Sequence, residues 1–121
     1  MKRTFFLPIK TVSEANQREH WGAKARRAKA QRTAAGLALR VALRGVVPPV
    51  SITLTRHVGA TGRKLDKDNL AGSMKHVQDG IADALGIDDG SELVRWEYLQ
   101  ERPTPPVWGV LVHVCDAKGA E

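Results

Sequence analysis

Four stretches of the chain alternate between apolar and polar residues, or run apolar, in the way that predicts β-strands. Thr4–Ile9 alternates and predicts a short strand. Val50–Arg56 alternates as a strand does when one of its faces is in water. Leu93–Gln100 also alternates and predicts a strand with few polar residues. Val107–Val114 is so apolar that it predicts a central strand.

Two stretches between these strands predict helices. From about Glu19 to Leu43 the chain is rich in alanine, arginine and lysine, which are strong helix formers, and Gly45 should end the helix. A second helix is predicted from about Asp68 to Leu85 by apolar residues that recur on one side at the helical period. The first helix should bury a stripe of mostly small residues, which are Trp21, Ala25, Ala28, Ala35, Leu39 and Ala42.

The order of these elements is β-α-β-α-β-β, which predicts an α/β chain of the α+β type. We expect a two-layer fold, in which a mixed sheet of about four strands carries two main helices on one face. At 121 residues the chain should form a single domain, residues 1–121, with 117–121 as a frayed tail. It has no apolar run near the roughly 20 residues of a membrane helix, so we expect a cytoplasmic protein without a membrane partner.

The net charge of +6 is unevenly distributed. Residues 1–64 hold 14 lysines and arginines against 2 glutamates, whereas residues 65–121 hold 5 against 11 acidic residues. A basic half of this kind suggests a polyanionic partner, although a solvated basic surface explains it about as well. The candidate DNA-binding residues lie on the first helix and in the loop before the second, and they are Arg26, Arg27, Lys29, Arg63 and Lys64.

Aspartates gather around the second predicted helix. Asp66 and Asp68 stand two apart at its start, where an extended chain would direct both carboxylates the same way, and Asp68 is at the expected N-cap. Lys75 and Asp79 fall on the face of Asp68 when the helix is drawn at 100° per residue. The pair Asp88 and Asp89 follows the helix and can return to its start only if the next strand runs beside the previous one.

Converging carboxylates without cysteine or histidine favour a hard cation, Mg²⁺ or Mn²⁺. Such an ion activates water and offsets the charge that develops on a phosphate ester. Lys75 could contact the phosphate, and an i,i+4 ion pair with Asp79 is the simpler role for the same side chain. From the residues alone we therefore predict metal-dependent chemistry on phosphates.

The string D66-K67-D68-N69-L70, followed by K75-x-x-x-D79 and by I87-D88-D89-G90-S91, resembles the RusA family of Holliday-junction resolvases, common in phages and prophages. The resemblance implies a homodimeric, Mg²⁺-dependent endonuclease that nicks four-way DNA junctions, with Mn²⁺ as a substitute ion. It implies that Asp66, Asp68 and Asp89 are both catalytic residues and metal ligands. It further implies that Lys75 is the family's essential lysine, supported by Asp79 and Asp88. The best-known members carry that lysine at the position of Gly72.

The resemblance implies no protein partner other than a second copy of the chain. It also implies a location in the cytoplasm of a bacterial host cell. Two other functions fit the same residues. A DNA-junction-binding module with a vestigial acidic cluster would bind without cutting. A basic α/β domain whose aspartates only cap helices and pair with arginines would bind no metal.

Overall fold

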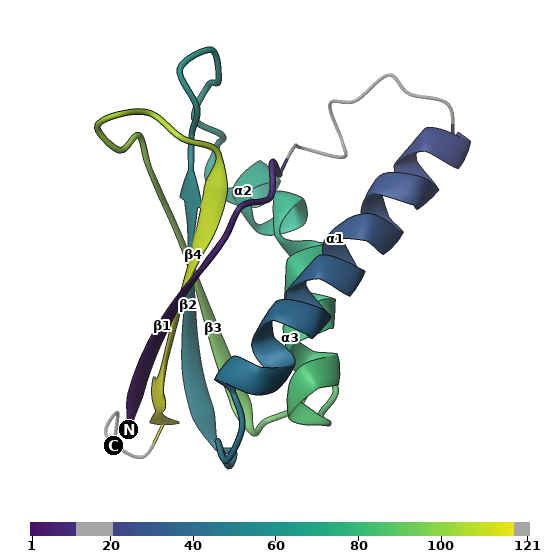
Figure 1. Ribbon diagram of the computed structural model, residues 1–121, viewed down its shortest axis with the longest axis vertical. Coiled ribbons are helices and arrows are strands. Elements are labelled where there is room, and N and C mark those ends of the chain that lie inside the picture. Colours follow the sequence, from purple (N-terminus) through teal and green to yellow (C-terminus); the bar gives the residue numbers. More distant parts are fainter. Residues whose placement is uncertain (12–20, 118–121) are drawn as a thin grey trace.

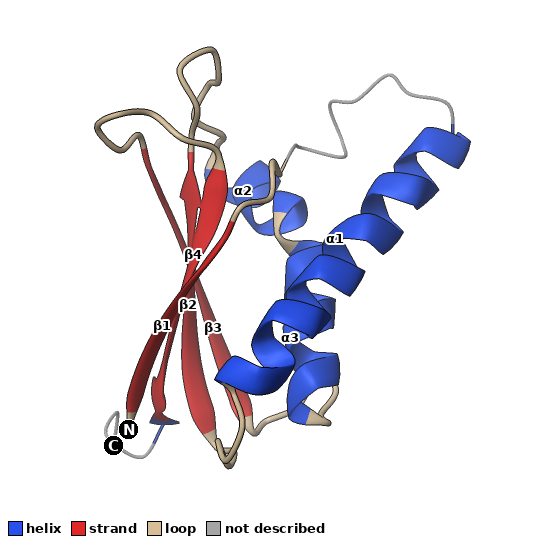
Figure 2. Cartoon of the chain, viewed as in Figure 1, coloured by secondary structure: helices blue, strands red, loops and turns tan. Residues whose placement is uncertain are grey.

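The computed structural model describes residues 1–11 and 21–117, with the backbone alone for residues 21, 23, 24, 27, 31, 34 and 35. A four-stranded mixed sheet forms one layer, and the helices form a second layer on one of its faces (Figures 1 and 2). The predicted fold class is therefore confirmed. The elements are β1 (Lys2–Leu7), α1 (Trp21–Ala42), β2 (Val50–His57), α2 (Lys67–Ser73), α3 (Lys75–Leu85), β3 (Val94–Glu101) and β4 (Gly109–Asp116).

The strand order is β1-β4-β2-β3, so the apolar β4 is internal, as its composition predicts, and β3 is an edge. The strands β2 and β3 pair in parallel, with Val50 opposite Val94, and the other two pairings are antiparallel. A parallel pair needs a crossover connection, which α2 and α3 supply. β3 runs beside β2, which is the condition set from the sequence for a return of Asp88 and Asp89 toward the start of the helix.

The core lies between the sheet and α3. Alternate residues of β2, including Ile52 and Leu54, point toward the helices and are fully buried, while the threonines between them are half-exposed. Val77 and Ile81 of α3 belong to the same core cluster and are also fully buried. The predicted wet face of β2 is confirmed, because period-2 alternation leaves one face of a sheet in water when helices cover only the other.

The predicted helix from Asp68 to Leu85 is wrong in one respect, because it is broken. Met74 has φ −98° and ψ −3° and separates α2 from α3; its N–H bonds to the carbonyls of Ala71 and Gly72. Its side chain is fully buried. A single helical wheel therefore does not hold across Met74, and the shared face inferred for Asp68 and Lys75 loses its geometric basis.

The predicted stripe on α1 is only partly correct. Leu39 is buried and Ala28 is half-buried, but Ala25 is exposed. The reason is that α1 packs chiefly against α3 rather than the sheet, and its first turns extend past the sheet (Figure 1). The two helices approach closely at Gly36, where an added Cβ would lie 3.8 Å from the carbonyl oxygen of Gly80.

Candidate metal and nucleic-acid site

Lys75 and Asp89, separated by 14 residues in the chain, meet in space. The Lys75 ammonium donates a short hydrogen bond to the Asp89 carboxylate, and it lies 3.2 Å from Asp79 Oδ1 one turn further along α3. The expected i,i+4 ion pair is thus present. About half of the Lys75 side chain remains exposed, so the amine is accessible from solvent. One lysine therefore joins the first turn of α3 to the segment that follows the helix.

Lys75 and Asp89 shift each other's pKa. The hydrogen bond from Lys75 is the largest cause of a lowered pKa at Asp89, and burial opposes it more weakly. The same bond is the largest cause of a raised pKa at Lys75, with Asp79 adding to it. Both shifts favour the charged forms, so an ionised pair holds the segment after α3 against the helix at neutral pH.

Beneath this pair lies a layer of polar groups that sequence reasoning missed. Gln78 is buried and accepts a short hydrogen bond from the Tyr98 hydroxyl, while its amide nitrogen lies 3.4 Å from Asp89 Oδ2. The Trp96 indole N–H donates to the Asp89 carbonyl over 2.9 Å. A glutamine beside the apolar arc of α3 was the available signal, because a buried amide needs partners. These bonds tie Asp89 to β3.

Asp66, not Asp68, is the N-cap of α2. Its backbone is extended (φ −69°, ψ 171°), and its Oδ1 accepts the N–H of Asn69 over 2.9 Å. Asp68 lies in the first helical turn, where its charge favours the helix dipole. The prediction that Asp68 is the cap is wrong, and so is the argument from an extended chain, since Lys67 and Asp68 are helical.

The donor chemistry of Asp66 and Asp68 fits a hard cation, because both carboxylates are exposed and supply only oxygen. Asp89 instead faces Lys75. Across residues 1–11 and 21–117, the described side chains form no group of three or more acidic, histidine or cysteine ligands that could hold a metal ion. Mg²⁺ commonly takes one or two protein carboxylates and completes its shell with water and phosphate. The three-ligand assignment of Asp66, Asp68 and Asp89 stays a prediction.

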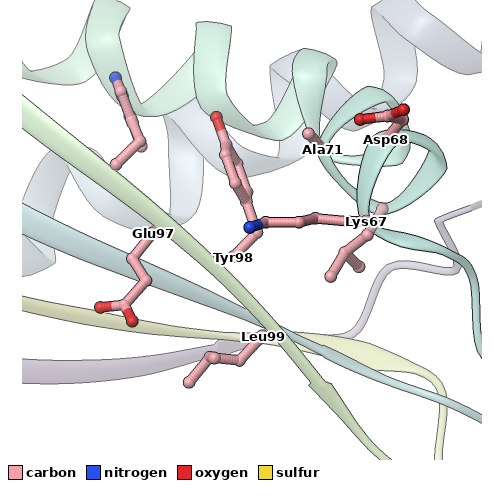
Figure 3. A pocket seen from close by; sticks show the side chains of 8 residues that line it. Lys67, Asp68, Ala71, Glu97, Tyr98 and Leu99 are labelled. Carbon is pink, nitrogen blue, oxygen red and sulfur yellow. The ribbon is translucent and has the colours of Figure 1, made fainter.

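A cleft of about 590 Å³ separates α2 from the edge strand β3. Figure 3 shows Tyr98 directed toward the helices from β3, with Glu97 and Leu99 on the other side of the strand. Asp68 lies on the opposite wall, on α2. The cleft thus has a candidate metal ligand on one wall and aromatic residues on the other. Its lining is Lys67, Asp68, Leu70, Ala71, Trp96, Glu97, Tyr98 and Leu99.

The predicted DNA-binding residues fall in two places. Arg26 and Lys29 are exposed on the part of α1 that extends past the sheet, and the Arg27 side chain lies outside the described part. Arg63 and Lys64 are exposed in the loop before α2. That loop is anchored from below by the buried Arg56, whose Nη1 donates to the Arg63 carbonyl over 3.1 Å. The sequence predicted these residues as DNA contacts, and that role stays a prediction.

Two further aspartates have different surroundings. Asp83, expected to be solvated, is exposed but accepts two hydrogen bonds from Arg32 of α1, at 2.7 and 2.9 Å. This contact, between residues 51 apart, raises the pKa of Arg32 and lowers that of Asp83. The pair neutralises one of the positive charges on α1. Asp88 is exposed beside Asp89, and its carbonyl accepts the Ser91 N–H over 3.0 Å in the turn before β3.

Comparison with protein-family models and with curated proteins finds no match for this chain. Within the described residues, no helix is long and apolar enough to span a membrane.

Proposed function

We propose that the chain is a Mg²⁺-dependent endonuclease that nicks four-way DNA junctions, as its resemblance to the RusA family implies. The observation that carries the proposal is the contact between Lys75 and Asp89. These residues come from two separate parts of the resembling pattern, and nothing in local sequence requires them to meet. Their contact supports the reading of both parts as one site.

In this proposal Asp66 and Asp68 hold the ion, which when bound supplies an activated water and offsets phosphoryl charge. Asp89 is the third proposed ligand. Its carboxylate would be free to contact the ion once Lys75 leaves it for a phosphate oxygen. Lys75 is half-exposed and keeps Asp79 as a partner throughout, so it can reach a phosphate without losing its orientation. Asp88 supports the turn that carries Asp89.

The basic residues supply the affinity for DNA in this proposal. Arg26, Arg27 and Lys29 on α1, with Arg63 and Lys64 beside α2, would contact phosphates on either side of the acidic site. We place the activity in the cytoplasm of a bacterial host, with a phage or prophage as the origin of the chain. No membrane and no protein partner other than a second copy is part of the proposal.

Two symmetric nicks need two sites related by a two-fold axis, so the proposed enzyme is a homodimer. The stretch Val107–Val114 was a candidate interface, but Val110, Val112 and Val114 are buried beneath the helices of the same chain. The uncovered face of the sheet is the better candidate, because Phe6 and Leu99 are each nearly half-exposed there. A light-scattering mass of two chains rather than one is expected.

The test is a nicking assay on a four-way junction, with a linear duplex of the same sequence as substrate control. With Mg²⁺ we expect nicks in the junction in preference to the duplex, and none with EDTA. Asp68→Asn should abolish nicking and keep junction binding. Asp116→Asn, an exposed aspartate at the far end of β4, is the matched control and should cut normally. Full activity of Asp68→Asn would refute the metal assignment.

A junction-binding module without catalysis is the second candidate, favoured by the ion pair that occupies Asp89. It predicts tight junction binding and no product with either Mg²⁺ or Mn²⁺. The same assay decides between the two functions, because specific nicks that disappear in Asp68→Asn exclude the module.

A further inference from the structure

We propose that the cleft between α2 and β3 binds the base of an unpaired nucleotide. The inference rests on the proposed function, since it takes nucleic acid to be the partner, and it adds a recognition site beside the acidic residues. Four features of the cleft carry it: its aromatic wall, the free edge of β3, its unpaired charges and its size.

The aromatic wall offers ring surface rather than polar atoms. The Trp96 indole N–H is used by the Asp89 carbonyl, and the Tyr98 hydroxyl is used by Gln78. Both side chains are half-buried, so part of each ring remains open to the cleft. A planar base can stack or pack edge-on against such rings whatever its sequence identity, because every base has a π face.

The backbone of β3 adds hydrogen-bonding groups next to these rings. The N–H of Val50 donates to the Leu93 carbonyl, and the N–H of Val58 donates to the Glu101 carbonyl. The backbone N–H and C=O groups of the odd-numbered residues of β3 therefore point toward β2. The N–H and C=O of Trp96 and Tyr98 therefore point away from β2, at the open edge of the sheet. They provide the closely spaced donors and acceptors that the edge of a base requires.

The charged groups of the cleft are available. The side chains of Lys67, Asp68 and Glu97 make no hydrogen bond or ion pair with any other described residue. The Lys67 ammonium suits the phosphate of a bound nucleotide. A volume of about 590 Å³ is within the range of small-molecule sites. A base stacked within a duplex cannot enter such a cleft, so the occupant is unpaired.

The test is a titration of the ¹⁵N-labelled full chain with deoxyadenosine 5′-monophosphate in EDTA, followed by amide and indole NMR shifts. We expect saturable shifts at the Trp96 indole and at the amides of residues 96–99. The sugar phosphate alone, 2-deoxyribose 5-phosphate, should leave the Trp96 indole unmoved. Shifts confined to α1, or equal shifts with the sugar phosphate, would overturn the proposal.

Ala71→Leu fills the cleft from α2 and should weaken the nucleotide roughly 5- to 150-fold, the size of one base–aromatic contact. Ala38→Leu makes the same change on an exposed position of α1 and should leave binding unchanged. Lys67→Ala, at an exposed position, is a second variant that should also weaken binding if Ala71→Leu does not fold. Wild-type affinity in a folded Ala71→Leu or in Lys67→Ala would refute the site.

The outcomes separate this inference from the function beneath it, because the titration contains no metal. A nucleotide response without junction nicking would support the base site and refute the endonuclease. Nicking without a nucleotide response would support the endonuclease and refute the base site. A cleft that ignores the nucleotide but changes with protein concentration would show that β3 pairs with a second copy, which also overturns the proposal.

Discussion

At the scale of single residues, Asp66 serves two purposes in our account: it caps α2, and it is a proposed metal ligand. The two purposes need different chemistry. A cap requires only an oxygen that accepts the Asn69 N–H, whereas a divalent ion requires the negative charge. Substitutions that keep one property and remove the other can therefore separate them.

We predict that Asp66→Ala lowers the free energy of unfolding by about 0.5–2 kcal/mol, the usual cost of losing an N-cap. Asp66→Ser keeps an accepting oxygen and should be close to wild type in urea unfolding. Both variants should lose junction nicking, because neither has a carboxylate. Nicking by Asp66→Ser at the wild-type rate would show that Asp66 is a cap alone.

A second residue-scale prediction concerns Asp89 and pH. Lys75 lowers the pKa of the Asp89 carboxyl in the folded state, so the pair adds stability above the unfolded pKa of about 3.9. That stability is lost as the pH falls through the lower, folded pKa. The free energy of unfolding of Asp89→Asn, measured in urea, should be lower than that of the wild type. The difference should be constant near neutrality and should shrink as the pH falls below about 4.

The neighbouring Asp88→Asn is the control, since the Asp88 carboxylate makes no ion pair with a described residue. Its unfolding free energy should follow that of the wild type throughout the same pH range. A deficit of Asp89→Asn that persists unchanged at pH 2 would mean that the Lys75 contact does not stabilise the fold.

At the scale of elements, the interruption between α2 and α3 decides where the candidate residues lie. Sequence periodicity extended one helix through Met74, because apolar residues recur on both sides of it with the helical spacing. The buried Met74 side chain and the turn at its backbone reorient the two halves. As a result, Asp68 faces the cleft beside β3, whereas Lys75 faces Asp89.

Two glycines at these helices allow a matched test. Gly72 is the penultimate residue of α2, and Gly86 caps α3 with φ +72°. A Cβ added at either one would meet no atom within 4 Å beyond its chain neighbours and its own helix backbone. Gly72→Ala should raise the free energy of unfolding by about 0.5–1 kcal/mol, because alanine favours the helix. Gly86→Ala should lower it by about 1–2 kcal/mol, because alanine is strained in the left-handed region.

Thermal or urea unfolding of the two variants measures both values. Because neither change creates a clash, opposite signs would come from the backbone conformation alone. A destabilised Gly72→Ala would mean that α2 does not keep its helical form in solution.

At the scale of the whole molecule, the charges are arranged by the packing. Positive side chains extend along α1 and reappear in the loop before α2, and the carboxylates of Asp66, Asp68 and Asp89 lie on α2 and after α3. The outer face of the sheet carries mixed charges, with Arg95 and Glu97 exposed side by side. A DNA partner would therefore bind on the helical side.

We predict that junction affinity falls steeply with salt, because each phosphate contact releases a counterion. Arg26→Ala should reduce the slope of log affinity against log salt by about 0.7–0.9, the contribution of one phosphate contact. Arg95→Ala removes an equal charge from the outer sheet face and should leave that slope unchanged. Fluorescence anisotropy of a labelled junction across a salt series measures both. Equal slopes for the two variants would refute the assignment of the helical side.

Local spacing in the sequence predicted the four strands and the fold class, but not the break between α2 and α3. Alternation in Val50–Arg56 and the apolar Val107–Val114 correctly predicted a strand with one wet face and an internal strand, because the identity of the buried face is written in local spacing. Gly45 correctly predicted the end of α1, since a residue with φ +82° favours glycine. The ion pair between Lys75 and Asp79 followed from their distance within one helix.

The contacts between distant groups came from the packing of the elements. The parallel pairing of β2 and β3 brings Asp89 to Lys75, the packing of α1 on α3 pairs Arg32 with Asp83, and the edge position of β3 opens the cleft beside Asp68. Local spacing carries no information on these contacts, because the separation of two residues far apart in the chain depends on how whole elements pack. The string of aspartates could therefore be recognised in the sequence, but their partners from distant parts of the chain could not.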